Sequence, residues 1–174
     1  MPVFFDIETQ NSFQEVGGRY PERLRVSVAV TYNTTDRAFH RYTEADIPAL
    51  VGELQAADLI VGFNLYGFDY PVLKRYTSVD LNRLPTLDML AELHKQLGFR
   101  VSLDSVAAAT LGINKSADGL QAVQWWKEGR LEDIFTYCEK DVDITRQVYE
   151  FGHQRHYVQY FDRQYRLQRV PVMW

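Results

Sequence analysis

The sequence has little of three features that often define a class of protein: cysteine, long apolar runs and excess positive charge. Cys138 is the only cysteine among 174 residues, so the chain forms no internal disulfide and assembles no cysteine-rich zinc site. No apolar run approaches the roughly 18 to 20 residues that a membrane-spanning helix needs, and no basic leader precedes the apolar segment that begins at Val3. We therefore expect a cytoplasmic protein with no membrane partner.

Acidic residues outnumber basic residues by 23 to 19, which gives a formal net charge of −4. This balance argues against a nucleic-acid-binding protein, because Lys and Arg make most contacts to phosphate. The argument holds only in part, since divalent cations held by clustered carboxylates reverse the sign of the local field. The placement of the acids along the chain therefore matters more than their sum.

The length and the hydrophobic pattern predict one α/β domain with a mixed sheet flanked by helices. Expected strands cover residues 3–9, 24–32, 38–42, 59–63 and 84–87, and the first three resemble an antiparallel meander. Expected helices cover residues 44–55, 69–76, 88–97, 103–111, 120–127 and 132–151. A β-hairpin follows over residues 157–172. We expect residues 1–152 to form the main domain and residues 153–174 to extend it as a C-terminal hairpin.

The first acidic motif lies in the segment 3–9, Val-Phe-Phe-Asp-Ile-Glu-Thr. Successive side chains of a strand point to opposite faces, so Asp6 and Glu8 share one face while Phe5 and Ile7 share the other. Two neighbouring carboxylates in an apolar strand repel each other and are costly to desolvate, and a bound cation relieves both effects. A frayed strand end with solvated acids gives the same pattern, so both interpretations stay open.

A second acid, Asp69, lies shortly after the apolar strand expected at 59–63, in the segment 64–71, Asn-Leu-Tyr-Gly-Phe-Asp-Tyr-Pro. Asp shortly before a first-turn Pro is typical of a helix N-cap. A carboxylate at the lip of the sheet is also suited to holding a metal-bound water. The two roles are compatible, because a capping aspartate leaves one oxygen free.

A third motif, Tyr137 and Asp141, lies on the helix expected over 132–151. Their spacing of four residues places the hydroxyl and the carboxylate on one face of the helix. Asp141 borders an apolar stripe that includes Cys138 and Val142, so we expect it to point toward the sheet. An ordinary amphipathic helix with an acid at its boundary gives a similar pattern.

Together the three motifs resemble those of the DEDD superfamily of 3′–5′ exonucleases, in its tyrosine subclass. The matching residues are, in chain order, Asp6 and Glu8, Asn64 and Asp69, and Tyr137 and Asp141. The whole resembles the proofreading domain of family B DNA polymerases, and related bacterial exonucleases that stand alone or are linked to helicases. This resemblance implies a ribonuclease H-like fold.

The resemblance also implies a reaction that uses two divalent cations to hydrolyse terminal phosphodiesters. Ligands that are all oxygen favour Mg²⁺ or Mn²⁺ over zinc. By the resemblance, Asp6 bridges the two cations, Glu8 and Asp141 complete the site of the attacking water, and Asp69 holds the second cation largely through water. Tyr137 orients the attacking water, since a phenol with a pKa near 10 is a weak base.

Three further residues are candidates for substrate contacts. Thr9 and Asn64 match positions that touch the terminal nucleotide in the family. Lys115, in the polar loop expected over 114–119, is either a phosphate contact or an ordinary solvated lysine. The implied substrate is the 3′ end of single-stranded DNA or RNA, with DNA favoured. The resemblance also implies a protein partner, which is a helicase or another DNA repair protein.

The expected C-terminal hairpin interleaves basic and aromatic residues. The basic residues are Arg155, Arg163, Arg166 and Arg169, and the aromatic residues are Tyr157, Tyr160, Phe161 and Tyr165. This composition suits single-strand binding, in which stacking contributes about 1–3 kcal/mol per base. Charges that protect an exposed hairpin edge from aggregation give the same composition.

Two other functions compete with the exonuclease. One is a catalytically silent module of the same fold that binds nucleic acid or protein, and the presence of every acid and the tyrosine counts against it. The other is an endonuclease of the ribonuclease H type, which lacks the Tyr-x-x-x-Asp helix.

Overall fold

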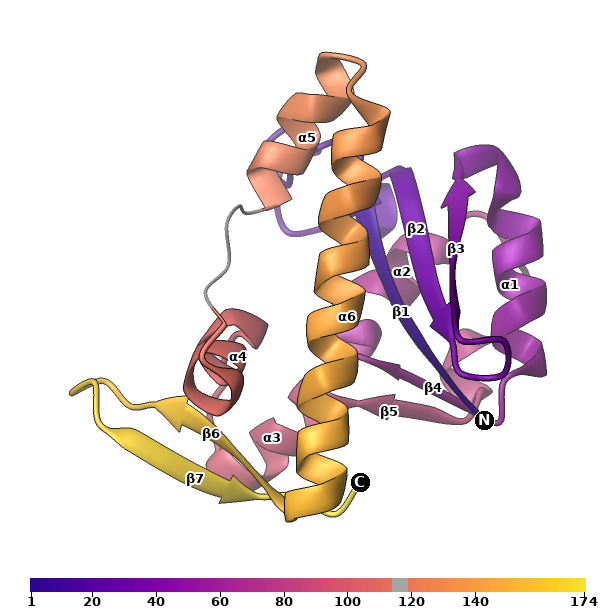
Figure 1. Cartoon of the computed structure of the whole chain (residues 1–174). Helices are drawn as coiled ribbons and strands as arrows, with labels where there is room; N and C mark the ends of the chain where they lie inside the picture. The colour runs from indigo at the N-terminus through magenta and orange to yellow at the C-terminus, as the bar shows by residue number, and fades with distance from the viewer. Residues whose placement is uncertain (114–118) are drawn as a thin grey trace.

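Helices flank a single five-stranded sheet, and a separate two-stranded hairpin follows the last helix (Figure 1). The computed structural model describes residues 1–113 and 119–174. The sheet contains β1 (Pro2–Thr9), β2 (Val26–Asn33), β3 (Ala38–Thr43), β4 (Leu59–Gly62) and β5 (Thr86–Asp88), in the order β3-β2-β1-β4-β5. The first three strands pair antiparallel, whereas β1, β4 and β5 pair parallel. The predicted mixed sheet and the opening meander are therefore confirmed.

Six α-helices lie among the described residues. They are α1 (Ile47–Ala56), α2 (Tyr70–Leu73), α3 (Met89–Leu97), α4 (Leu103–Leu111), α5 (Gly119–Lys127) and α6 (Leu131–Arg155). Short helical turns of other types are η1 (Pro21–Arg23), η2 (Glu44–Asp46), η3 (Leu65–Asp69) and η4 (Leu81–Arg83). Of the described helices, none combines the length and the apolar character that crossing a bilayer requires.

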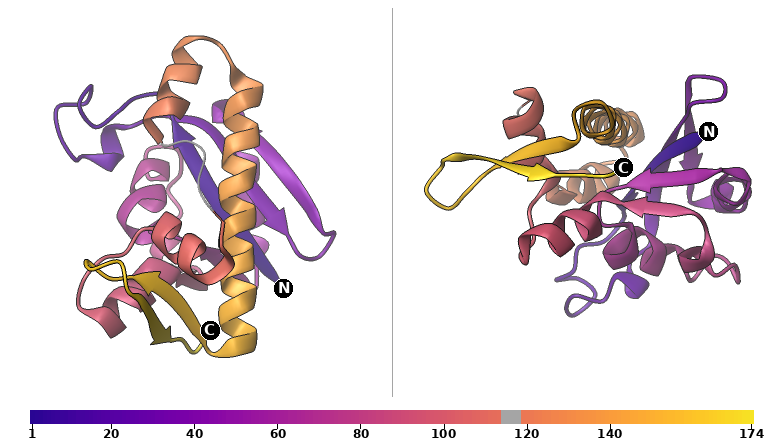
Figure 2. Two further views of the ribbon diagram at one scale, coloured as in Figure 1. Left: turned by 60° about the vertical axis from the view of Figure 1, so that its left-hand side comes forward. Right: turned by 90° about the horizontal axis from the view of Figure 1, so that it is seen from below.

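The alternation of side chains along β1 divides the interior into two cores, one on each face of the sheet. Phe4 packs in the core that α3, α4, α5 and α6 cover, whereas Val3, Phe5 and Ile7 pack in the core that α1 and α2 cover. Helix α6 runs along one face of β1 and β2 (Figures 1 and 2). Asp6 and Glu8 must therefore face α6, because they share the side of β1 that carries Phe4.

Helix α6 extends one turn beyond the end expected at residue 151. Gly152, expected to end the helix, lies inside it, and Trp174 packs so closely there that a Cβ on Gly152 would come within 2.5 Å of the Trp174 indole nitrogen. The helix instead ends at His156, which adopts a left-handed conformation with φ of 60° and donates its backbone N–H to the Gly152 carbonyl. The proposed division of the chain between residues 152 and 153 stays a prediction.

The C-terminal hairpin, β6 (Tyr157–Phe161) and β7 (Leu167–Pro171), forms where the sequence predicts it. It projects from the base of α6 alongside α4 (Figure 1). The Thr110 hydroxyl of α4 donates to the Gln159 carbonyl at 3.1 Å and accepts from the Gln159 N–H at 2.9 Å. These two bonds fix the hairpin to α4, so its position is set by the fold.

Candidate active site

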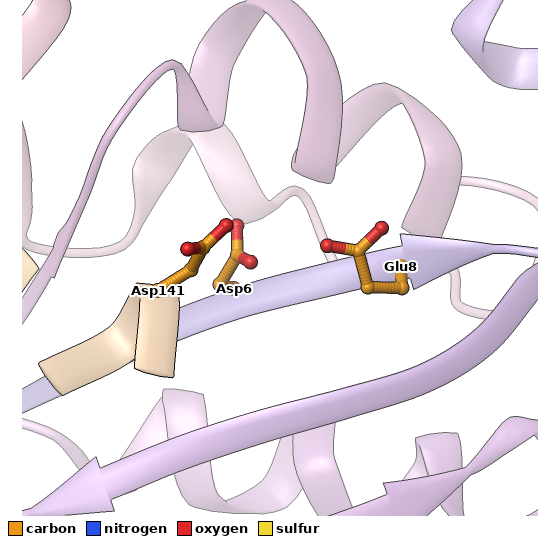
Figure 3. Close-up of side chains that lie close together, drawn as sticks. All are labelled: Asp6, Glu8 and Asp141. Carbon is orange, nitrogen blue, oxygen red and sulfur yellow. The ribbon is translucent and has the colours of Figure 1, made fainter. Parts of the chain in front are cut away.

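Three carboxylates from two elements meet where α6 crosses β1. Asp6 and Glu8 rise from the same side of β1, as the alternation predicts, and Asp141 reaches toward Asp6 from α6 (Figure 3). One carboxylate oxygen from each of the three residues lies within 4.8 Å of the others. Asp141 is 6% exposed and Glu8 is 9% exposed, so these charges lie largely beneath the surface. The expected orientation of Asp141 toward the sheet is confirmed.

Asp69 lies at the end of η3, and it is 1% exposed. The predicted N-cap role is wrong, because Asp69 has helical backbone angles (φ −61°, ψ −49°) and its side chain makes no capping hydrogen bond. A π-helical turn over Leu65–Asp69 continues directly into α2, so no helix starts at Asp69 and the helix expected over 69–76 is shorter. The Asp69 carboxylate therefore does not cap a helix.

The Asp69 carboxylate is in an unfavourable environment without a cation. Its Oδ1 atom is buried and has no hydrogen-bond partner among the residues described. Burial, and then the negative charges of Asp6 and Asp88, raise the pKa of Asp69 well above the usual value for aspartate. A buried oxygen without a partner costs about 1–3 kcal/mol, so a ligand at this oxygen would remove a penalty.

Asp88 holds η3 in place, and the sequence motifs did not single it out. Its Oδ1 accepts hydrogen bonds from the backbone N–H groups of Leu90 at 3.0 Å and Ala91 at 3.3 Å, which caps α3. The same carboxylate accepts from the N–H groups of Asn64 at 2.8 Å and Tyr66 at 3.0 Å. One aspartate thus joins the start of α3 to the turn that carries Asp69. An Asp before an apolar helix is a recognisable cap, but its second pair of bonds depends on tertiary contacts.

Tyr137 lies on α6 beside the three carboxylates, and it is 6% exposed. Its ring packs edge-on against Trp125 at 6.1 Å between centroids. Burial, and then the negative charges of neighbouring acids, with Asp141 foremost, raise the pKa of Tyr137 above the usual value for tyrosine. The hydroxyl therefore stays protonated near neutral pH, which suits it to orienting a water and not to removing a proton.

Cys138 contacts the first acid from the side of α6. Its buried sulfur lies 3.5 Å from the Asp6 carbonyl oxygen and 3.7 Å from Asp6 Oδ2. Burial, followed by the charges of the surrounding acids, raises the pKa of Cys138 well above its usual value. The protonated thiol is a weak donor that helps to position the Asp6 carboxylate.

A pocket of about 410 Å³ adjoins Glu8 and Thr9. Phe13 and Phe68 line it, and their rings pack edge-on at 6.0 Å between centroids. Leu120 of α5 lines it as well. The Thr9 hydroxyl donates to the Asn11 carbonyl at 2.9 Å, which fixes this side of the pocket. The sequence motifs did not identify Phe13 or Phe68, because 55 positions separate two rings that only the fold brings together.

Of the other two predicted substrate contacts, Asn64 is among the described residues and Lys115 is not. Asn64 adopts a left-handed conformation with φ of 73° at the end of β4, and its side-chain oxygen accepts a hydrogen bond from Arg100 Nη2 at 2.7 Å. The Asn64 oxygen is thus already engaged with Arg100, and its contact with a nucleotide stays a prediction. Lys115 falls outside the described residues, so its predicted phosphate contact is also untested.

The residues present fit a divalent cation. Three carboxylates offer oxygen atoms within 4.8 Å of one another, and the buried Oδ1 of Asp69 is near Asp6 and lacks a hydrogen-bond partner among the described residues. Ligand sets made only of oxygen suit Mg²⁺ and Mn²⁺. Carboxylates held this close repel one another, and a cation between them converts that repulsion into attraction.

Adding Mn²⁺ is expected to raise the unfolding temperature by about 5–10 °C at roughly a hundred times the dissociation constant. Without metal, the raised pKa of Asp69 means that the contribution of this residue to stability is fully present below its unfolded-state pKa near 4 and is lost as the pH rises through the folded-state value. Because cations bind the deprotonated acids, the gain should be larger near pH 8 than near pH 5. Thermal unfolding with and without EDTA measures both effects. An equal gain in Asp6→Asn would contradict binding at this site.

Comparison with known proteins supports the fold. A family model described as the RNase_H superfamily matches residues 3–151. A solved structure of the family B DNA polymerase from the hyperthermophilic archaeon Pyrobaculum calidifontis is similar, with 20% sequence identity and a TM-score of 0.67. The match covers 87% of this chain and 24% of the polymerase chain, so this chain spans about a quarter of that protein. No curated protein matches the sequence. The predicted ribonuclease H-like fold is confirmed, whereas the DEDD group and its tyrosine subclass stay predictions.

Proposed function

Because the chain belongs to the RNase_H superfamily, we propose that its clustered carboxylates make it a metal-dependent 3′–5′ exonuclease acting on single-stranded nucleic acid, with DNA favoured. The observation that carries this proposal is the meeting of Asp141 on α6 with Asp6 and Glu8 on β1. Tyr137 lies beside them on the same helix. The substrate, the direction of digestion and the two-metal chemistry are parts of the proposal.

Four carboxylates would hold two divalent cations, Mg²⁺ or Mn²⁺. The ligands are Asp6, Glu8, Asp69 and Asp141. Bound cations would activate the attacking water and stabilise the leaving 3′ oxygen. Asp69 would add its buried Oδ1 from the end of η3, near Asp6. Four converging acids also explain why a chain of net charge −4 can approach phosphate once cations are bound.

Tyr137 has the properties of a group that positions water. Its ring packs against Trp125, and its hydroxyl lies close to the Asp141 carboxylate. Since its pKa is raised, it donates a hydrogen bond and keeps its proton through the reaction. Orientation of the attacking water by a fixed donor lowers the entropic part of the barrier.

The pocket beside Glu8 and Thr9 would receive the terminal nucleoside. Its volume of about 410 Å³ lies within the usual range for small-ligand pockets. The rings of Phe13 and Phe68 offer apolar surface to a base or a sugar. Thr9, together with the predicted contacts Asn64 and Lys115, would complete the binding of the last nucleotide.

The two competing functions make different demands on this site. A silent binding module has no need for three carboxylates within 4.8 Å of one another, because their repulsion destabilises the fold without a cation. A ribonuclease H-type endonuclease requires the strand to continue past the acids on both sides. The Tyr137 and Asp141 pair on α6, which an endonuclease of that type lacks, favours the exonuclease. A helicase or other DNA repair partner and a cytoplasmic location stay predictions from the sequence.

Digestion of single strands labelled at either end is expected to separate these functions. With Mg²⁺ or Mn²⁺, a 5′-labelled strand should shorten one nucleotide at a time, and a 3′-labelled strand should release its label as a mononucleotide at once. EDTA should stop both reactions. Internal fragments from both substrates would instead indicate an endonuclease, and intact substrates with retained binding would indicate a silent module. A parallel RNA strand tests the preference for DNA.

A further inference from the structure

A second groove lies between the C-terminal hairpin and the segment that joins α3 to α4. It has a volume of about 820 Å³ and is lined by residues 99–102, Ser105 and residues 160–164. It is separate from the pocket beside Glu8, with which it shares no lining residue. The two walls come from parts of the chain about 60 positions apart, and α4, which is bonded to Gln159 through Thr110, holds them in a fixed relation.

Aromatic side chains form much of the surface of this groove. Phe99 is 45% exposed and Phe161 is 42% exposed, although both are large apolar residues. The ring of Phe99 packs edge-on against Tyr160 at 5.8 Å between centroids, which links the two walls. Exposed aromatic faces that are fixed by neighbouring packing offer stacking surface without a further loss of side-chain freedom.

The charge that faces the groove is positive. Arg100 and Arg163 line it, and among the described residues of its lining Asp162 is the only acid. The Asp162 carboxylate accepts from the N–H groups of Gln164 at 2.8 Å and Arg166 at 3.0 Å, and from Arg166 Nε at 2.9 Å. These bonds, with the backbone N–H of Arg166 foremost, lower the pKa of Asp162 to about 2. The Asp162 charge is therefore engaged within the hairpin turn. Arg163, and the part of the Arg100 guanidinium that does not bond to Asn64, can then contact a ligand.

The groove connects to the acidic site through one hydrogen bond. Arg100 Nη2 donates at 2.7 Å to the side chain of Asn64, which stands at the end of β4 and begins the turn to Asp69. Arg100 therefore lies between the acidic site and the hairpin. A strand whose last nucleotide lies beside Glu8 would meet this arginine as it extends toward the groove. In the left view of Figure 2, α4 lies beside the hairpin and α6 passes in front of the sheet.

We propose that this groove binds the single-stranded segment of the substrate that lies 5′ of the terminal nucleotide. Exposed aromatic faces for bases, combined with arginines for phosphates, are the recognition chemistry of single strands without sequence preference. The inference rests on the proposed function for the identity of the strand end. It assigns a substrate-binding role to the hairpin, whose composition also fits simple protection of an edge.

Binding of fluorescent oligothymidylates in EDTA tests this role without cleavage. The variant Phe99→Ala/Arg163→Glu alters one exposed residue on each wall. It should bind an oligonucleotide of about 12 nucleotides roughly tenfold more weakly than the unchanged protein, and it should bind one of about 3 nucleotides equally well. The slope of log affinity against log salt should fall by about 0.7 or more in magnitude.

The matched control is Leu167→Ala/Arg169→Glu. It makes the same kind of change in an exposed apolar residue and an exposed arginine of β7, outside the groove. This control should bind the long oligonucleotide within about twofold of the unchanged protein. If both variants bind the long oligonucleotide equally weakly, the loss is a general effect of charge, and the proposed role of the groove is wrong. Thermal unfolding of each variant verifies that the fold is kept.

A photocrosslink gives a measurement that needs no variant. A strand with a photoreactive base about five nucleotides from its 3′ end should crosslink to the peptide that contains residues 157–166. Crosslinks only to other segments, or unchanged affinity of the groove variant, would overturn the inference. If the protein binds as described but never degrades a strand, the exonuclease proposal fails while the groove stands. If it degrades strands and the groove variant binds normally, the groove alone fails.

Discussion

Asp141→Asn is expected to reduce terminal hydrolysis by about a thousandfold or more, and Asp6→Asn is expected to do the same. Each change keeps the shape of the side chain but removes one of three charges held within 4.8 Å. Loss of a cation ligand forfeits several kcal/mol of charge stabilisation in the transition state, and about 4 kcal/mol corresponds to a thousandfold in rate. The rate of mononucleotide release with Mg²⁺, at saturating substrate, measures this effect.

The matched control for Asp141 is Asp143→Asn, two residues further along α6. The Asp143 carboxylate bonds to Arg146 Nη2 at 2.6 Å and to Gln147 Nε2 at 2.7 Å, and it takes no part in the acidic cluster. This variant should keep nearly full activity, since Asp143 lies outside the acidic cluster and an ion pair near the surface contributes little. Removing a charge from the cluster relieves repulsion, so Asp141→Asn should unfold in EDTA no earlier than the unchanged protein. Degradation by Asp6→Asn or Asp141→Asn at the normal rate would refute the site.

Local periodicity in the sequence is enough to predict the part of the site that lies on regular elements. The strand alternation of β1 places Asp6 and Glu8 on one face, and the spacing of four on α6 places Tyr137 beside Asp141. Both relations depend only on the geometry of one element. By the same alternation Phe4 and Phe5 point to opposite faces, and they pack in the two cores on either side of the sheet.

The surroundings of Asp69 were not predictable in the same way. A Pro two positions later suggests a helix that starts at Asp69, and local rules contain no reason to expect a π-helical turn before it. That turn is set by tertiary contacts: the N–H groups of Asn64 and Tyr66 bond to Asp88, which is more than 20 positions away. Gly67 allows the Asn64 side chain to pack against its Cα, where a Cβ would collide with it. Such a turn follows from the assembled fold.

The binding surfaces escape prediction for a related reason. The pocket beside Glu8 depends on the contact of Phe13 with Phe68, and the groove depends on the contact of Phe99 with Tyr160. Each contact joins segments that are far apart in the sequence, so local patterns do not predict it. Composition identifies the hairpin as basic and aromatic, but it does not distinguish a binding wall from a protected edge. The contact of Arg100 with Asn64 supplies the missing relation, because it connects the groove to the end of β4.

Asp88→Ala is expected to destabilise the protein by about 3–4 kcal/mol, which is about 10 °C in unfolding temperature for a domain of this size. The carboxylate is 4% exposed and accepts from four backbone N–H groups, those of Asn64, Tyr66, Leu90 and Ala91. Alanine removes the cap of α3, worth about 0.5–2 kcal/mol, and leaves the N–H groups of the η3 turn without their acceptor. Thermal and urea unfolding measure the loss.

Asp80→Ala is the matched control, since Asp80 also caps a short helix, η4, but it is exposed and its bonds to Asn82 are 3.3 and 3.4 Å long. It should cost less than about 1 kcal/mol. Asp88→Ala should also slow hydrolysis at temperatures where it remains folded, because the turn that presents Asp69 is no longer held to α3. A variant that unfolds within about 2 °C of the unchanged protein and hydrolyses at the normal rate would show that η3 keeps its shape without Asp88. The position of Asp69 would then depend on its own packing against the core that α1 and α2 cover.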